Sequence, residues 1–162
     1  MMIEVIRVGM ADLKVACHPS IITTLGLGSC VGITLYDSKK KIIGMAHIML
    51  PSSKIATANT NRAKFADTGI VDLLEKMTAL GAERKEIVSK IAGGAQMFNF
   101  AGSNETLKIG ARNSEAVKQV LNELRIPIVA EDIGGNHGRT IEISSEDGKL
   151  MVKTIGYGIK YL

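Results

Sequence analysis

Apolar residues in this chain fall mostly into short runs of strand length, and in two places they recur with helical spacing. Seven or eight such runs, bounded by glycine, proline or charged residues, predict strands. The clearest are 12–17, 31–36, 41–50 and 128–133. The helical spacing predicts one helix over 63–80 and another over 114–124. Gly81 follows the first helix, where glycine suits a C-terminal cap.

The order of these elements favours an α+β fold over an alternating parallel α/β sheet. Most of the strands follow one another as hairpins, and two helices are enough to cover one side of a sheet. The runs 31–36 and 41–50 are apolar on both faces. A hairpin of that kind is buried on both sides, so we expect it to form the middle layer of a sandwich.

Chain length and charge favour a single domain that does not bind nucleic acid. At 162 residues the chain fits one domain, which we expect to extend over 1–162. Its net charge of +4 is small and spread out, and no aromatic cluster surrounds the run Lys39-Lys40-Lys41, so we expect no nucleic-acid partner.

Targeting signals and cysteine usage indicate the compartment. The N-terminus has no signal-peptide pattern, and no apolar run approaches the ~20 residues that span a bilayer. Cys17 and Cys30, the two cysteines, are therefore read as reduced thiols. We expect a cytoplasmic protein without direct membrane insertion.

Cys30 carries the clearest sign of chemistry. It ends a glycine-containing loop and precedes an apolar strand. A four-residue hairpin turn over 37–40 would pair Tyr36 with Lys41. Counting back along both strands then places Cys30 directly opposite His47, on the same face of the sheet. A thiol beside an imidazole resembles a nucleophile and its general base, although a register shift of one residue would separate them.

The loop before Cys30 offers the other groups that this chemistry needs. Gly28 leaves the backbone open to a substrate carbonyl, and N–H groups near Ser29 and Cys30 are candidate donors to an oxyanion. A histidine base is usually oriented by a third group. Thr24 and Thr23 lie just upstream and offer a hydroxyl or a backbone carbonyl for that purpose.

Other reactive side chains lie outside the hairpin. A second glycine-rich loop carries Asn136, His137 and Arg139. It is either a simple turn or a cleft wall where the arginine meets a carboxylate, with His137 as a rival base. Cys17 and His18 do not complete a common zinc pattern with the hairpin residues, and the glycines do not match a dinucleotide fingerprint. We expect neither a metal nor a cofactor.

Five stretches, in order along the chain, together carry a family resemblance. They are TLGLGSCV at 24–31, GMAHIMLP at 44–51, GGAQMF at 93–98, IGARN at 109–113 and GGNHGR at 134–139. Each alone would be weak, but the set resembles the CheD family of chemoreceptor glutamine deamidases over nearly the whole chain.

The resemblance implies an activity and assigns residues to it. Selected glutamine side chains on the cytoplasmic helices of methyl-accepting chemotaxis receptors would be hydrolysed to glutamate. Cys30 would be the nucleophile that forms a thioester, His47 the acid and base, and Thr24 the third catalytic residue. The implied fold is a layered α/β/β sandwich of mixed, largely antiparallel sheets with helices on one side. The implied protein partner is CheC, a phosphatase of phosphorylated CheY.

Two alternatives stay open at this stage. Cysteine is often a small buried hydrophobe, so the chain could be a non-catalytic module that binds receptors or CheC. It could also hydrolyse receptor methyl esters with the same cysteine. A catalytic Cys30 is expected to have a depressed pKa and to alkylate faster than Cys17. The loops near 53–61, 96–100 and 136–139 are the places where receptor recognition is expected.

Overall fold

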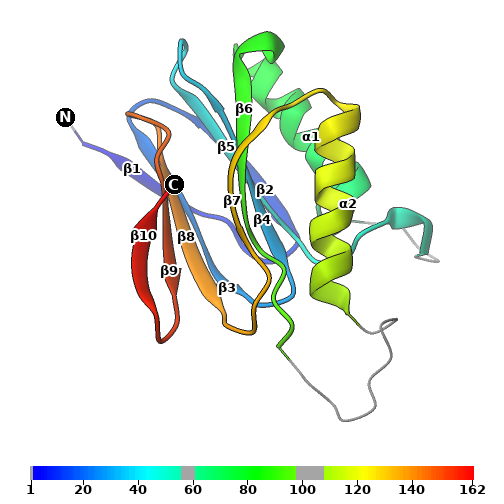
Figure 1. Ribbon diagram of the computed structural model, residues 1–162. Helices are drawn as coiled ribbons and strands as arrows, with labels where there is room; N and C mark the ends of the chain where they lie inside the picture. Colours follow the sequence, from blue (N-terminus) through cyan, green and yellow to red (C-terminus); the bar gives the residue numbers. More distant parts are fainter. Residues whose placement is uncertain (1, 56–60, 98–107) are drawn as a thin grey trace.

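Strands outnumber helices in the computed structural model, which describes residues 2–55, 61–97 and 108–162. Two α-helices in this part of the chain, α1 (Ala66–Ala79) and α2 (Ile109–Glu123), accompany two sheets (Figure 1). The strands are β1 (Glu4–Arg7), β2 (Asp12–Cys17), β3 (Ser20–Leu27), β4 (Val31–Asp37), β5 (Ile42–Ile48), β6 (Ile87–Gly93), β7 (Ile128–Ile133), β8 (Arg139–Ser144), β9 (Leu150–Thr154) and β10 (Gly158–Tyr161). Short 3-10 turns occur at Ser53–Ile55, Arg62–Lys64 and Arg84–Glu86.

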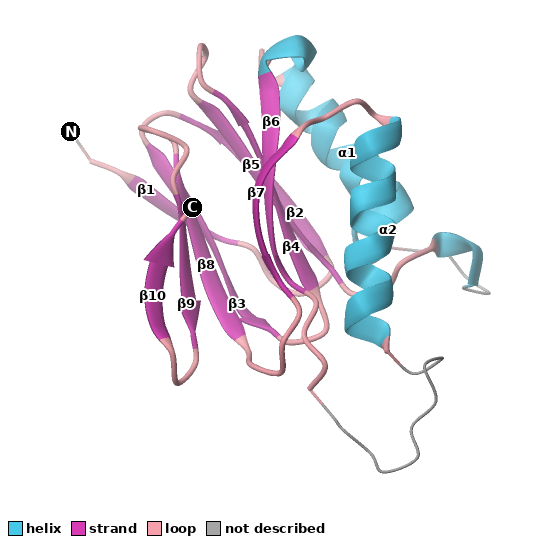
Figure 2. Ribbon diagram, in the orientation of Figure 1, coloured by secondary structure: helices cyan, strands magenta, loops and turns pink. Residues whose placement is uncertain are grey.

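The strands form two five-stranded sheets that pack face to face. One has the order β1-β3-β8-β9-β10 and the other the order β2-β5-β4-β6-β7. All neighbouring strands are antiparallel except β1 with β3 and β6 with β7. Both helices lie on the outer face of the second sheet (Figure 2). This arrangement is a layered α/β/β sandwich with helices on one side, which confirms the predicted fold class.

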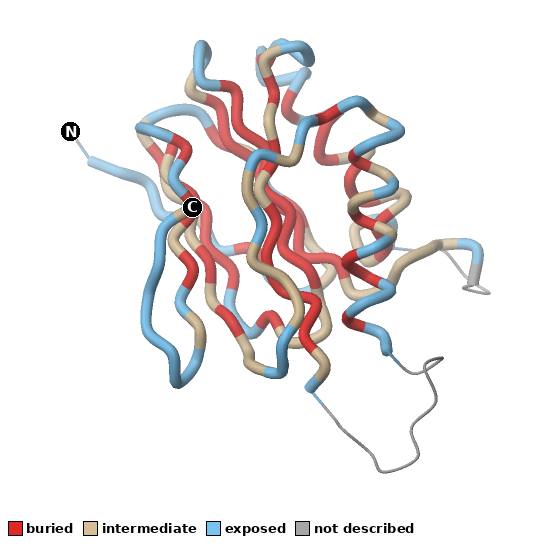
Figure 3. Tube along the Cα trace, in the orientation of Figure 1, coloured by how far each residue is buried: buried red, intermediate tan, exposed pale blue. Residues whose placement is uncertain are grey.

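The β4–β5 hairpin forms the centre of the molecule. Every residue of both strands is buried, as the tube coloured by burial shows (Figure 3). Residues such as Ile33 and Leu35 pack toward the helices, whereas Tyr36 and Met45 pack toward the other sheet. The strands therefore have no solvent face, which confirms their predicted place in the middle layer.

Most element boundaries agree with the sequence, and the differences have physical causes. The strands β2 and β7 have the predicted bounds. β10 was missed because all four of its residues are exposed, so no burial pattern marks this edge strand. α2 begins at Ile109 instead of the predicted 114, because its first turn buries Gly110 and Asn113 in place of large apolar side chains.

The predicted cap of α1 is present. Gly81 has φ 114°, a conformation that favours glycine, and its N–H donates to the Thr78 carbonyl at 3.0 Å. The N–H of Ala82 donates to the Met77 carbonyl, also at 3.0 Å. This pair of hydrogen bonds is a Schellman motif, so the helix ends where the glycine predicts.

A β-bulge near the end of β3 sets the direction of its side chains. Thr24 pairs with Ile141 and Leu27 pairs with Arg139, so β3 uses one residue more than β8. Gly26 lies within the bulge at φ 69°, which glycine adopts without strain. Because of the extra residue, Thr24 and Leu27 can both point inward, and both are fully buried.

The first turn of α2 docks closely on the end of β6. A Cβ atom on Gly110 would overlap the carbonyl oxygens of Gly94 and Ala95, and a Cβ atom on Gly94 would overlap the Ser114 hydroxyl. Gly94 also has φ 64°. Glycine at both positions therefore allows the helix to approach the residues that follow β6.

Candidate active site

The β4–β5 hairpin closes in a different register from the predicted one. The last pair is Asp37 with Ile42, and the predicted pair of Tyr36 with Lys41 is wrong. The Asp37 carboxylate explains the difference, because it accepts hydrogen bonds from the N–H groups two and three residues later, at 2.9 and 3.1 Å. Lys41, at φ 52°, consequently belongs to the turn.

This register changes the partner of His47 but not its side of the sheet. Gly32 lies opposite His47, and Cys30 precedes the first residue of β4. Because side chains alternate along a strand, a shift of two residues leaves the expected side unchanged. His47 is fully buried, and Cys30 packs against the apolar cluster between the two sheets. Both side chains therefore belong to the space between the sheets.

Thr24 holds the His47 ring from the opposite sheet. The Thr24 hydroxyl donates to the Val8 carbonyl at 2.7 Å and lies 2.7 Å from His47 Nδ1. Since its single hydrogen goes to the carbonyl, the hydroxyl must accept a hydrogen bond from Nδ1–H. A neutral ring with its proton on Nδ1 carries its lone pair on Nε2. The structure thus brings Thr24 and His47 together and leaves Nε2 as the basic atom.

The thiol and the imidazole are not hydrogen-bonded to each other in this structure. His47 Nε2 is buried without a hydrogen-bond partner among the described residues, Cys30 included. Burial raises the pKa of the Cys30 thiol, and a hydrogen bond from its own backbone N–H lowers it by less. Burial also lowers the pKa of His47. Both groups are therefore held neutral, which contradicts the expected depressed pKa of Cys30.

The backbone of residues 28–30, here called the cysteine loop, is held by its carbonyl oxygens. The Gly28 carbonyl accepts a hydrogen bond from the Ala95 N–H at 2.8 Å. The Ser29 carbonyl accepts from Asn113 Nδ2 and the Cys30 carbonyl from the Gly94 N–H, each at 2.9 Å. The C=O and N–H of one trans peptide point in opposite directions. The N–H of Ser29 therefore points away from Ala95, and the N–H of Cys30 points away from Asn113.

The residues predicted to line a cleft lie in different settings. Gly28 is half-buried beneath Met97, whose Cγ would lie 2.9 Å from a Cβ atom at position 28. Arg139 is buried, and it donates to Asp132 Oδ2 and to the Gly93 carbonyl, both at 3.2 Å. Its guanidinium thus supports the chain behind the cysteine loop through Nε and Nη1, and its predicted contact with a substrate carboxylate stays a prediction.

The remaining candidates lie away from Cys30 or make other contacts. Asn136 is exposed, and the His137 ring lies 4.3 Å from the Tyr157 ring, centroid to centroid. Cys17 pairs with Ile42 at the far end of β5 from His47, so it cannot form a disulfide with Cys30. Within the described ranges, no three His, Cys, Asp or Glu side chains are grouped to hold a metal ion.

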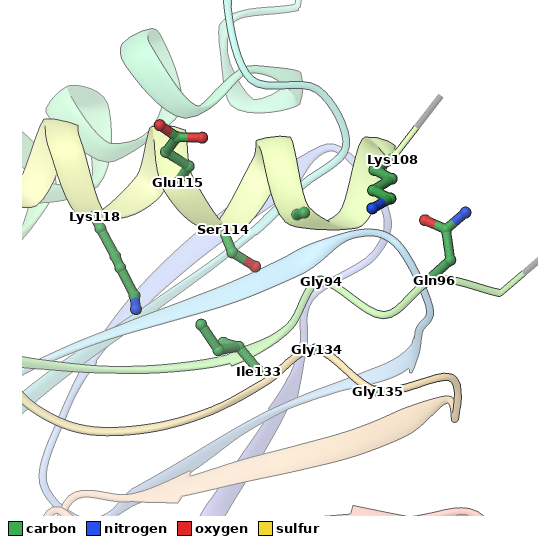
Figure 4. A pocket seen from close by; sticks show the side chains of 10 residues that line it. Gly94, Gln96, Lys108, Ser114, Glu115, Lys118, Ile133, Gly134 and Gly135 are labelled. Atoms are coloured by element: carbon green, nitrogen blue, oxygen red, sulfur yellow. The ribbon is translucent and has the colours of Figure 1, made fainter. Parts of the chain in front are cut away.

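A separate pocket of about 650 Å³ opens between α2 and the ends of β6 and β7. Figure 4 shows Lys118, Ser114 and Lys108 reaching toward it from the helix side, with Gly134 and Gly135 across from them. None of the three predicted catalytic residues lines it. Residues 56–60 and 98–100, which belong to the predicted recognition loops, lie outside the described residues.

Sequence reasoning missed two groups that support the site. The Val8 carbonyl, which fixes the Thr24 hydroxyl, is a backbone atom and leaves no signal in the residue types. Asn113 does leave a signal. It continues the buried stripe of Val117 and Leu121 at intervals of four residues, and a buried amide in such a stripe needs hydrogen-bond partners.

Comparisons with known proteins show to which family the chain belongs. A family model described as CheD chemotactic sensory transduction matches residues 49–154. The chain belongs to the CheD family. A probable chemoreceptor glutamine deamidase CheD of Caldanaerobacter subterraneus subsp. tengcongensis is 58% identical over 98% of both chains. The chemoreceptor glutamine deamidase CheD of Halalkalibacterium halodurans is 54% identical over 97% of this chain and 98% of its own.

The matched segment of the CheD model begins after His47, so the three predicted catalytic residues are covered by the full-length relatives alone. Among solved structures, the Bacillus licheniformis hypothetical protein YfiH is similar with a TM-score of 0.47 and 16% identity, over 75% of this chain and 49% of its own. Across the described ranges of this CheD-family chain, the helices are all too short or too polar to cross a membrane.

Replacing Thr24 by valine should release the imidazole. The change leaves His47 Nδ1–H and the Val8 carbonyl buried without partners, which costs about 1–3 kcal/mol of unfolding free energy. The ring nitrogens in an NMR spectrum should report a single Nδ1–H tautomer in the wild type and a mixture in Thr24→Val.

Thr23→Val is the matched control. Its buried hydroxyl donates to the Ile141 carbonyl at 2.9 Å and touches no histidine. It should lose stability without changing the His47 ring signals. Unchanged ring signals in Thr24→Val would show that the hydroxyl does not set the tautomer.

Proposed function

We propose that this chain is a chemoreceptor glutamine deamidase in which Cys30 is the nucleophile, His47 the general base and Thr24 the residue that orients the base. The observation that carries the proposal is the hydrogen bond between Thr24 and Nδ1, because it leaves the Nε2 lone pair for a proton from the thiol. The full-length relatives with this name support the substrate class.

In the first half of the reaction, the Cys30 sulfur attacks the carbon of the glutamine side-chain amide. The thiol proton moves to His47 Nε2 as the S–C bond forms, and the carbonyl electron pair moves onto oxygen. The imidazolium then gives its proton to the amide nitrogen, which leaves as ammonia. The product of this half is a thioester between Cys30 and the former glutamine.

In the second half, water releases the acid. His47 Nε2 takes a proton from the water as its oxygen attacks the thioester carbon. When the tetrahedral intermediate collapses, the S–C bond breaks and the sulfur recovers a proton from the imidazolium. The substrate side chain leaves as glutamate, and both Cys30 and His47 return to their starting states.

Backbone N–H groups are the proposed oxyanion donors. The N–H groups of Ser29 and Cys30 point away from Ala95 and Asn113, which hold the carbonyls of the same two peptides. Donors of this kind stabilise the negative oxygen of a tetrahedral intermediate more than the starting carbonyl. Because His47 Nε2 has no hydrogen bond to the thiol in the resting site, the Cys30 side chain has to turn toward Nε2 during the reaction. Such a change is common, since catalytic hydrogen bonds are often loose before substrate binds.

Receptor helices are suitable substrates for physical reasons. The backbone amides of a helix are hydrogen-bonded within it, so a surface glutamine presents only its side-chain amide. The enzyme would therefore modify the receptor without cutting its chain. Fragments of shorter chain length on a gel after incubation would contradict this.

On the family resemblance, we also propose CheC as a protein partner in the cytoplasm. The absence of a complex in size-exclusion chromatography at micromolar concentrations would count against it.

Intact mass spectrometry of a receptor cytoplasmic fragment tests the proposed reaction directly. Each deamidation replaces NH₂ by OH and should raise the mass by about one dalton. The wild type and the Cys17→Ala variant should both produce this gain, because Cys17 lies at the far end of the hairpin. Cys30→Ala should produce none.

Other results would favour the alternatives. Loss of mass from a methylated fragment, without any gain on glutamines, would indicate a methylesterase. No change with several receptor fragments, while CheC binding is retained, would indicate a non-catalytic binding module.

The pH dependence of kcat/KM should reflect the neutral thiol and neutral imidazole. Burial lowers the pKa of His47, so the base stays unprotonated down to pH values below its ordinary pKa of about 6.5. Burial raises the pKa of Cys30, so the thiol keeps its proton in the same range. We expect constant kcat/KM from about pH 8 to 6.5, with a decline only at lower pH. A decline centred above pH 7 would instead indicate a site that depends on a preformed thiolate.

A further inference from the structure

Asn113 connects the two parts of the chain that carry the proposed nucleophile and base. It is the fifth residue of α2 and is fully buried. Its side-chain nitrogen donates to the Ser29 carbonyl and to the Met49 carbonyl, each at 2.9 Å. Ser29 immediately precedes Cys30, and Met49 follows His47 by two residues. One amide group therefore joins the cysteine loop to the end of β5.

The chemistry of the partners fixes the orientation of this amide. Both partners are carbonyl oxygens, which only accept hydrogen bonds, so the nitrogen and its two hydrogens must face them. The amide oxygen of Asn113 is buried and has no partner within the described ranges. A buried acceptor in that state lowers the stability of the fold. The fold thus tolerates an unsatisfied oxygen in order to present two donors at this point.

The close approach of α2 makes the contact possible. Gly94 and Gly110 lack the Cβ atoms that would push the helix away from the chain after β6. The N–H of Gly94 donates to the Cys30 carbonyl, so the segment after β6 contacts both the first turn of α2 and the cysteine loop. Asn113 then reaches past this segment to the carbonyl of the preceding residue, Ser29.

The geometry points to Asn113 as a positioning residue that aims the Cys30 N–H at the oxyanion. This inference rests on the proposed deamidase function. The Ser29 carbonyl and the Cys30 N–H belong to one peptide plane and point in opposite directions, so a bond to the first fixes the direction of the second. The second bond, to Met49, holds the end of β5 at a fixed place relative to the same peptide.

Kinetics of the Asn113→Ala variant on a receptor fragment should separate positioning from folding. Loss of an oxyanion donor lowers kcat by 10²–10³-fold, so a misdirected donor should lower it by about 10- to 100-fold while KM changes less than about twofold. Alkylation of Cys30 by iodoacetamide forms no oxyanion. Its rate, measured with Cys17→Ala in the background, should therefore stay within about twofold of the parent.

Ser114→Ala is the matched control, because it changes the next buried residue of α2. Its hydroxyl donates to the Gly110 carbonyl within the helix, and in the described part of the chain it has no hydrogen bond to the cysteine loop. Its kcat should equal that of the wild type. Equal kcat in Asn113→Ala and wild type would overturn the inference. A parallel loss of kcat and of alkylation would also overturn it, because that pattern indicates a general loss of structure.

The NMR spectrum of the free protein tests the role of Asn113 without any substrate. The backbone amide resonance of Cys30 should shift in Asn113→Ala and stay in place in Ser114→Ala. An inactive wild type would refute the deamidase, and the resonance would still decide whether Asn113 sets the Ser29–Cys30 peptide. If Asn113→Ala does not fold, Asn113→Ser, which keeps one shorter donor, carries the same measurements.

Discussion

The hydrogen bond between Thr24 and His47 is the directional contact on which the candidate site depends. Thr24 belongs to β3 in one sheet, and His47 belongs to β5 in the other. The surrounding contacts between the sheets are apolar, and such contacts favour burial without fixing an angle. The Thr24 hydroxyl, fixed in turn by the Val8 carbonyl, adds the direction that these contacts lack. It determines which ring nitrogen of His47 holds the proton.

A hydroxyl in this position has different consequences from a carboxylate. A carboxylate beside the ring would stabilise the imidazolium and raise its pKa. Here a neutral hydroxyl orients the ring, and burial lowers the pKa of His47 while it raises that of Cys30. Both shifts favour an uncharged resting pair, and in the proposed mechanism charge develops when the thiol attacks a substrate carbonyl. Because the thiolate is the reactive form of cysteine, we expect a neutral Cys30 to alkylate more slowly than an ionised one.

Much of this arrangement could be predicted from the sequence, and the failures have clear causes. The hairpin was placed in the middle layer because both faces of its strands are apolar, and that prediction was correct. The predicted register of the hairpin was wrong because the Asp37 side chain closes the turn, and the pattern of apolar residues in the strands does not encode that contact. The two-residue error kept His47 on the expected side, since side chains alternate with a period of two. β10 was missed because an exposed edge strand has no apolar face to detect.

The site residues also divide into those that the residue pattern reveals and those that it does not. Cys30 and His47 were proposed because their side chains have recognisable chemistry, whereas the choice of Thr24 over Thr23 came from the family resemblance. The direction of the cysteine loop depends on the Asn113 side chain and on two distant backbone N–H groups, and the backbone contacts are not revealed by residue types. The charge of Arg139 suggested a ligand for a substrate carboxylate, and in the interior it binds the Asp132 carboxylate and the Gly93 carbonyl.

The five stretches that resemble the CheD family have a common physical explanation in this fold. Two of them supply the side chains of the proposed reaction, and the other three hold the backbone around it. Gly94 and Ala95 bind carbonyls of the cysteine loop, and Asn113 binds the one between them. The loop that ends at Arg139 in turn holds Gly93, whose carbonyl accepts from the Gly134 N–H at 3.0 Å and from the Arg139 side chain. A thiol and an imidazole can react only at a defined separation, so the proposed reaction depends on the residues that fix the backbone as well as on the reacting side chains.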